Sequence, residues 1–171
     1  MKRGLALVSL LLVLSACGGE PFRLHHNRPI PDFVKQQGVY IEEAFEQDPG
    51  RINGVVEGLR NALEERKVPV MSSPQTPNKI VITRIRENRT VSGYSASRQV
   101  REYNHTIEVD YKLVSPYINA PIEQTIRAER SQVYNSTYVL GTAEEEIAIK
   151  QELQQEAVRL MLLRLQALDL K

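Results

Sequence analysis

The longest regular pattern in the chain is the alternation of apolar and polar residues between residues 99 and 114. One face carries the apolar and aromatic residues together with one histidine: Tyr103, His105, Ile107, Val109, Tyr111 and Leu113. The other face carries the polar residues: Glu102, Asn104, Thr106, Glu108, Asp110 and Lys112. A period of two predicts a strand with one buried and one wet face, as in an antiparallel sheet that is covered on one side. The rest of the chain must therefore supply neighbouring strands and a cover.

Two further segments are suited to pair with this strand. Residues 79–86 and 122–134 are strand-like, the second with Ile122, Ile126 and Ala128 pointing inward, and short connections predict an antiparallel meander. A shorter segment rich in β-forming residues, 38–42, predicts a first strand, and residues 71–78 predict a loop because they contain two serines and two prolines.

Two helices are expected to cover the sheet. The first is predicted at residues 49–66, with Asp48 as its N-cap, Pro49 as its first residue and an end before Pro69. Its apolar stripe consists of Ile52, Val55, Val56, Leu59 and Leu63. A last helix opens at Thr142 with Glu145 in a capping-box pattern, and its stripe is Ile149, Leu153, Ala157, Leu160, Leu163 and Ala167. The order β-α-β-β-β-α predicts an α+β fold with a four-stranded, mainly antiparallel sheet covered on one side by two helices.

Gly50, Gly54 and Gly58 fall at a spacing of four on the side of the first helix away from its apolar stripe. Each glycine costs up to about 1 kcal/mol relative to alanine in a helix. The strip is consistent with a weak helix that is stabilised by its sheet, or with a surface that contacts a partner.

The N-terminus has the features of an export signal. Met1-Lys2-Arg3 is positively charged, and the apolar run from Leu5 to Leu14 is too short for the roughly 20 residues that a membrane-spanning helix needs. Leu14-Ser15-Ala16-Cys17 resembles a bacterial lipobox, which implies a signal peptide at 1–16 and covalent lipid on Cys17. Gly18-Gly19, in place of the aspartate typical of inner-membrane retention, favours the periplasmic side of the outer membrane.

Residues 17–36 are interpreted as the acylated cysteine and a tether, because Pro21, Pro29 and Pro31 favour extended backbone. The apolar residues Phe22, Leu24, Ile30 and Phe33 indicate that part of this tether docks on the folded part. Residues 37–171 are predicted to form a single α+β domain.

Charge and motifs exclude several classes of function. Without residues 1–16 the chain has 20 basic and 21 acidic residues, since Lys2 and Arg3 leave the total of 22, so general nucleic-acid binding is not expected. No phosphate loop, zinc-protease motif or nucleophile elbow is present. His105 falls on the apolar face and is interpreted as structural, and His25-His26 lacks a second cluster of metal ligands. We therefore predict no enzymatic activity, no metal and no cofactor other than the lipid.

Five arginines concentrate in residues 84–101, where Glu87 is the only acidic residue: Arg84, Arg86, Arg89, Arg98 and Arg101. The planar guanidinium fork matches phosphate oxygens in a bidentate manner. A hairpin with arginines on both arms is suited to bind an anionic headgroup. Alternatively, these side chains face water and pair with Glu87, Glu102 or the acidic start of the last helix.

Several features together resemble the lipopolysaccharide-assembly lipoprotein family LptE. They are the lipobox, Phe22-Arg23-Leu24, the element order, Glu102-Tyr103 at the start of the long strand, and the Glu-rich last helix that ends in Arg164-Leu165-Gln166-Ala167-Leu168. The resemblance implies a plug inside the LptD barrel that helps this barrel assemble and binds lipopolysaccharide. Arg98 is the best positional match to the family's basic residue, with Arg101, Arg86 and Arg89 beside it on the hairpin.

Two other functions remain open from the sequence. One is a lipid-binding accessory lipoprotein of another envelope transport system. The other is a cell-wall hydrolase, which needs a carboxylate pair or a nucleophile in a cleft, and the sequence shows no such constellation.

Overall fold

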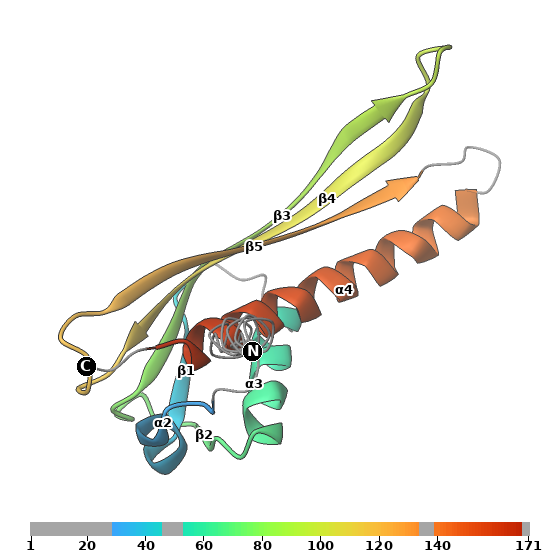
Figure 1. Cartoon of the computed structure of the whole chain (residues 1–171). Helices are drawn as coiled ribbons and strands as arrows, with labels where there is room; N and C mark the ends of the chain where they lie inside the picture. Colours follow the sequence, from blue (N-terminus) through green and yellow to red (C-terminus); the bar gives the residue numbers. More distant parts are fainter. Residues whose placement is uncertain (1–28, 46–52, 134–138, 169–171) are drawn as a thin grey trace, which may run out of the picture.

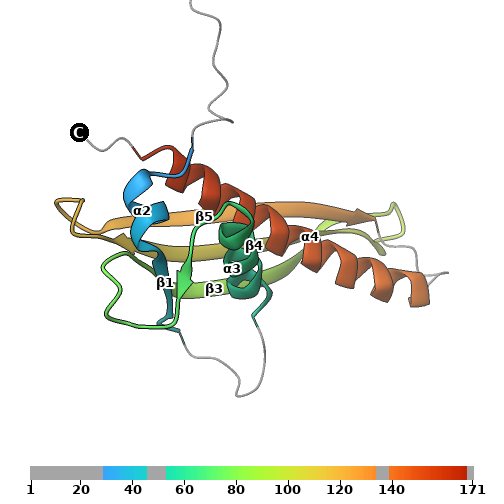
Figure 2. The ribbon, with the colours of Figure 1, turned by 90° about the horizontal axis from the view of Figure 1, so that it is seen from below.

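The computed structural model describes residues 29–45, 53–133 and 139–168. One sheet has the strand order β2-β1-β3-β4-β5, with β1 Val39–Glu43, β2 Val70–Met71, β3 Lys79–Tyr94, β4 Val100–Val114 and β5 Ile122–Val133. The helices are α2 Asp32–Gln37, α3 Gly54–Glu65 and α4 Val139–Gln166. Figures 1 and 2 show α3 and α4 on the same face of the sheet, so the expected α+β fold is confirmed.

The sheet has five strands and not the expected four. The antiparallel meander β3-β4-β5 is confirmed, whereas β1 pairs in parallel with both β2 and β3. The additional strand, β2, takes Met71 from the segment predicted as a loop. Two residues are too few to display a period, so the sequence pattern does not reveal this strand.

β3 continues well beyond the predicted end at residue 86. It pairs with β4 as far as Tyr94↔Val100, and its residues 86–92 are exposed. A strand that is wet on both faces needs no alternation of apolar and polar residues, which explains why the pattern underestimated its length.

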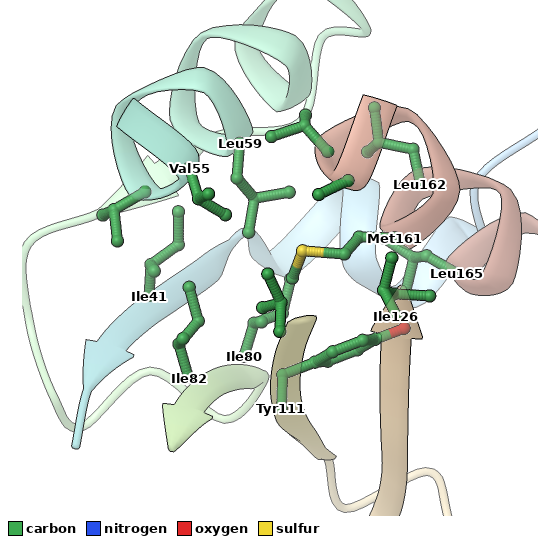
Figure 3. Close-up of a cluster of buried hydrophobic side chains, with 14 of the residues drawn as sticks. Ile41, Val55, Leu59, Ile80, Ile82, Tyr111, Ile126, Met161, Leu162 and Leu165 are labelled. Carbon is green, nitrogen blue, oxygen red and sulfur yellow. The ribbon is translucent and has the colours of Figure 1, made fainter. Parts of the chain in front are cut away.

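The core lies between the sheet and the two long helices. Figure 3 shows Val55 and Leu59 of α3 and Met161, Leu162 and Leu165 of α4 above Ile41, Ile80, Ile82, Tyr111 and Ile126 of the sheet. The predicted stripe of α4 was only partly right. Leu160 and Leu163 are half-buried and Ala167 is exposed, whereas Val158, Met161, Leu162 and Leu165 are buried. The buried face continues in steps of four residues, so it rotates away from the predicted stripe.

α3 begins later than predicted. Asn53 caps it, because its side-chain oxygen accepts a hydrogen bond from the backbone N–H of Val55 at 3.0 Å, while Asp48 lies outside the described residues. At the other end the N–H of Val68 donates to the carbonyl of Leu63, and Lys67 adopts a left-handed φ of 60°. This Schellman arrangement ends the helix one residue before the predicted position.

The described glycines of the predicted strip face α4 of the same chain. A Cβ atom at Gly58 would lie 3.2 Å from Cγ2 of Val158, and one at Gly54 would overlap the amide oxygen of Gln154. The strip therefore permits close packing of two helices within the chain. Gly50 lies outside the described residues.

The folded part begins before residue 37, where the tether was expected to end. Ile30 and Val34 are buried, and the rings of Phe33 and Tyr117 lie 5.1 Å apart. Residues 30–36 therefore belong to the folded part. Docking was anticipated for Ile30 and Phe33, while the helical form of Asp32–Gln37 was not.

Asn78 holds this N-terminal segment to the sheet. Its side chain is fully buried, and its amide group donates to the carbonyls of Phe33 at 3.2 Å and Gly38 at 3.0 Å. The hydroxyl of Ser115 donates to the Asn78 side-chain oxygen at 2.7 Å. One asparagine thus joins the first turn of α2, the residue before β1 and the residue after β4.

Candidate functional site

The β3–β4 hairpin projects beyond the ends of β5 and α4, at the opposite end of the molecule from α2 (Figure 1). The buried core does not extend into it, since residues 86–92 of β3 are exposed. The hairpin is thus a paired but wet extension of the sheet. We refer to Ser95–Gln99 and the adjoining strand ends as the hairpin tip.

Arg98 occupies a special backbone position in the hairpin tip. The N–H of Arg98 donates to the carbonyl of Ser95 at 2.9 Å, the N–H of Ser95 donates to the carbonyl of Gln99 at 2.8 Å, and Arg98 has a φ of 63°. This is a tight turn whose last loop residue is left-handed, a position where glycine is usual. Arg98 is exposed there.

Arg101 is located at an irregularity of the hairpin. The register passes from Tyr94↔Val100 to Gly93↔Glu102, so Arg101 is an extra residue without a partner on β3. Bulges of this kind redirect a side chain from the regular alternation. Within the described ranges, neither Arg101 nor Arg98 forms an ion pair with a carboxylate, and both side chains are exposed.

Arg84 and Arg86 belong to the polar face of the sheet that is turned away from the helices. Arg84 pairs with Asp110, and Arg86 pairs with Glu108, which also accepts from Arg127 at 3.0 Å. The rows across this face are Arg84-Asp110-Thr125, Arg86-Glu108-Arg127, Asn88-Thr106-Glu129 and Thr90-Asn104-Ser131. Hydrogen bonds from Thr125 and Arg84 lower the pKa of Asp110, which keeps its carboxylate charged.

Arg89 lies on the opposite face, between the sheet and α4. Its guanidinium carbon is 4.0 Å from the ring centroid of Tyr103, and it donates to Glu146 of α4 at 2.6 Å. Hydrogen bonding to Tyr103 and the charge of Glu146 raise the pKa of Arg89. Lys150 of α4 pairs with Glu87 in the same region. The N-terminal half of α4 is thus held to the hairpin partly by charged contacts.

The structure therefore divides the four predicted binding residues into two pairs. Arg86 and Arg89 already have carboxylate partners. Only the pair Arg89–Glu146 matches the alternative interpretation, which expected partners at the acidic start of the last helix. Arg98 and Arg101 lie together at the hairpin tip. The cross-strand partners of Arg86 and the stacking of Arg89 on Tyr103 were not foreseen, because both depend on strand register.

The remaining predicted residues are structural or lie outside the described part. His105 is buried, and its Nε2 is 2.8 Å from the side-chain oxygen of Gln132, so the structural interpretation is confirmed. Cys17, His25 and His26 precede the described residues. The described part of the chain contains no cluster of three metal-ligating side chains. None of its helices is long and apolar enough to cross a membrane.

Comparison with known proteins gives a family match and several similar folds. The family model described as LptE, lipopolysaccharide-assembly, matches residues 37–165. A comparison with curated proteins finds no match.

Three solved lipoprotein structures share the fold. Lipoprotein B from Nitrosomonas europaea is 21% identical, with 88% of this chain and 91% of that chain covered and a TM-score of 0.64. Rare lipoprotein B from Shewanella oneidensis is 13% identical, with 72% and 90% covered and a TM-score of 0.61. A minor lipoprotein from Acinetobacter baumannii is 13% identical, with 77% and 91% covered and a TM-score of 0.60.

Proposed function

Because the chain belongs to the LptE family of lipopolysaccharide-assembly proteins, we propose that it is a non-enzymatic lipoprotein that binds lipopolysaccharide with its β3–β4 hairpin inside an LptD-type outer-membrane barrel. The observation that carries the binding is the pair Arg98 and Arg101. Both are exposed at the projecting hairpin tip, and neither forms an ion pair within the described ranges.

Phosphate groups of lipopolysaccharide match the chemistry of this pair. A guanidinium fork donates two parallel hydrogen bonds to phosphate oxygens, and a charge-assisted hydrogen bond of this kind is about twice as strong as a neutral one. Arg98 and Arg101 bind without giving up an existing carboxylate. Arg86 would have to release Glu108, and Arg89 would have to release Glu146, before either could bind a phosphate group. In this proposal they therefore contribute to binding only by exchanging a carboxylate for a phosphate.

The polar face of the sheet supports the barrel as a partner. Three strands present charged and hydroxyl or amide side chains on that face, in the rows that begin with Arg84, Arg86, Asn88 and Thr90. The lumen of an outer-membrane barrel is also polar. A sheet face of this composition therefore fits a lumen and does not fit the hydrocarbon of a bilayer.

Lipid on Cys17 completes the proposal. The lipobox places the anchor twelve residues before Pro29, the first described residue, and the hairpin tip lies at the other end of the folded part. An anchor on the periplasmic side of the outer membrane would therefore join the folded part at the end opposite the arginines.

The double variant Arg98→Asn with Arg101→Gln is expected to bind lipopolysaccharide about tenfold to a hundredfold more weakly, because each charge-assisted hydrogen bond contributes roughly 1.5–3 kcal/mol and part of it is replaced by water. The measurement is a titration with purified lipopolysaccharide at low and high NaCl. The difference between variant and parent is expected to shrink as salt screens the charges.

Asparagine is chosen at position 98 because it tolerates the left-handed backbone of the turn, so the variant keeps the hairpin. The matched control is Arg60→Gln with Arg66→Gln, which removes the same charge from the surface of α3. Unchanged affinity of the hairpin variant at low salt, with an unchanged circular dichroism spectrum, would remove the hairpin from the proposed site.

The barrel partner is tested separately by affinity purification of the tagged chain from detergent-solubilised envelope. We expect a large β-barrel protein to copurify in near-equal amount and to survive a wash at high salt. Recovery of components of another lipid transporter, without a barrel, would instead favour the accessory-lipoprotein alternative.

A further inference from the structure

The two halves of α4 are attached to the rest of the chain in different ways. Residues 143–154, which we call the polar half of α4, contribute only Ile149 and Leu153 to the core. Residues 155–166 contribute five buried side chains, Ala157, Val158, Met161, Leu162 and Leu165, and Figure 3 shows the last three packed above the sheet. Hydrophobic burial therefore fixes the second half of the helix more firmly than the first.

Charged and amide groups hold the polar half to the sheet. Its ion pairs with β3 and β5 are formed by side chains that are each more than one-third exposed. Exposed ion pairs are weak and are screened by salt. The contacts join Arg89 to Glu146 at 2.6 Å, Lys150 and Gln154 to Glu87, Gln132 to Glu145 at 3.2 Å, and Arg130 to Glu152 at 3.7 Å.

A cavity of about 210 Å³ lies between the polar half and the strands β3 and β4. Its walls include Arg89, His105, Glu146 and Lys150. A space of this volume holds several water molecules. Because the side chains of Arg89 and Glu146 are also 41% and 43% exposed, water and small anions reach this ion pair from solvent.

Two arginines lie on one row of the sheet beneath the polar half. The register places Arg89, His105 and Arg130 next to one another on β3, β4 and β5. Two strand spacings, about 10 Å, separate the two arginines. Each guanidinium has a carboxylate of α4 as its partner, Glu146 or Glu152. Since carboxylate and phosphate match the guanidinium fork in the same manner, these two glutamates occupy positions that suit phosphate groups.

We propose that the polar half of α4 is an autoinhibitory cover. Glu146 and Glu152 mask Arg89 and Arg130, and phosphate groups bind this row by displacing both carboxylates, which detaches residues 143–154 from the sheet. Residues 155–166 stay in the core, so the helix opens at one end. The inference rests on the proposed function for its ligand, lipopolysaccharide. By linkage, weakening the cover strengthens phosphate binding, and bound phosphate weakens the cover to the same degree.

Glu146→Gln is a variant that should gain affinity. It removes the carboxylate that masks Arg89, so it is expected to bind purified lipopolysaccharide about two- to fivefold more tightly than the parent. Glu144→Gln is the matched control, because Glu144 lies on the same helix, is exposed and forms no ion pair within the described residues. Both variants lose one negative charge, so general attraction of the anionic ligand changes equally in the two.

Hydrogen exchange with mass spectrometry measures the opening itself. The sample is the full chain in detergent, with and without a saturating amount of lipopolysaccharide. We expect the ligand to accelerate exchange of the backbone amides of residues 143–154 by at least about fivefold and to leave residues 157–165 unchanged. About 1 M NaCl without ligand is expected to accelerate the same residues, because salt screens the ion pairs that hold them.

Two results would overturn the cover. One is equal affinity of Glu146→Gln and Glu144→Gln, and the other is unchanged exchange of residues 143–154 when lipopolysaccharide is bound. The hairpin variant Arg98→Asn with Arg101→Gln, titrated in parallel, separates this failure from that of the proposed function. If the hairpin variant binds more weakly while the cover fails, the hairpin tip remains the site. If it binds as the parent does while Glu146→Gln binds more tightly, the row of Arg89 and Arg130 is the site and the hairpin tip is not.

Discussion

Replacement of Cys17 by alanine is expected to remove the protein from the outer-membrane fraction of a density gradient, lowering its amount there by more than about tenfold, because two or more acyl chains are what makes a lipid anchor stable. The apolar run from Leu5 to Leu14 is too short to replace such an anchor as a spanning helix. Mass spectrometry of the parent should show diacylglyceryl and acyl groups on a chain that begins at Cys17.

Ser15→Ala is the matched control, since it changes the same motif but keeps a small residue and the acceptor thiol. It is expected to fractionate as the parent does. Persistence of the Cys17→Ala variant in the outer membrane, in cells that lack the proposed barrel partner, would show that the folded part binds the membrane by itself. In that case the anchor would no longer explain the location.

The second large effect is expected from Asn78→Ala, which should lower the free energy of unfolding by about 3 kcal/mol or more. The alanine leaves the carbonyls of Phe33 and Gly38 and the hydroxyl of Ser115 without their buried partner. Urea denaturation followed by circular dichroism measures the change. The loss should be greatest at the junction of α2 and β1, where hydrogen exchange should accelerate first.

Two further variants isolate the cause. Asn88→Ala removes an exposed asparagine of β3 and should change the free energy of unfolding by no more than about 0.5 kcal/mol. Asn78→Asp keeps the size but replaces the amide donors with an oxygen that faces two carbonyls, and it should be at least as damaging as alanine. A small effect of both changes at position 78 would mean that water replaces the asparagine.

The pattern of apolar and polar residues predicted those helices and strands that have one face in the core and the other in solvent. The strand β4 could be predicted because Ile107 and Val109 point into the core while Glu108 and Asp110 point to solvent. The outer half of β3 meets water on both sides, and β2 has only two residues, so neither generates a period. The same limit explains why α2 was not predicted, since Val34 is its single buried residue and one residue cannot display a period.

The arginine cluster shows the corresponding limit for the site. Composition identified Arg86, Arg89, Arg98 and Arg101 as a group, but the sequence does not reveal which of them are already paired. Glu108 becomes the partner of Arg86 only through the register of β3 with β4, and Glu146 reaches Arg89 only because α4 packs over the sheet.

The parallel pairing of β1 with β3 bears on the order in which the chain folds. β1 reaches its partner only after α3 and β2, so Ile41 lies next to Ile80, thirty-nine positions later in the chain. Closing such a loop precedes any gain from the contact, whereas the hairpins β3–β4 and β4–β5 join neighbouring segments. Until β3 has formed, β1 can pair only with the two residues of β2, so its other edge stays open to unintended strand pairing during this interval.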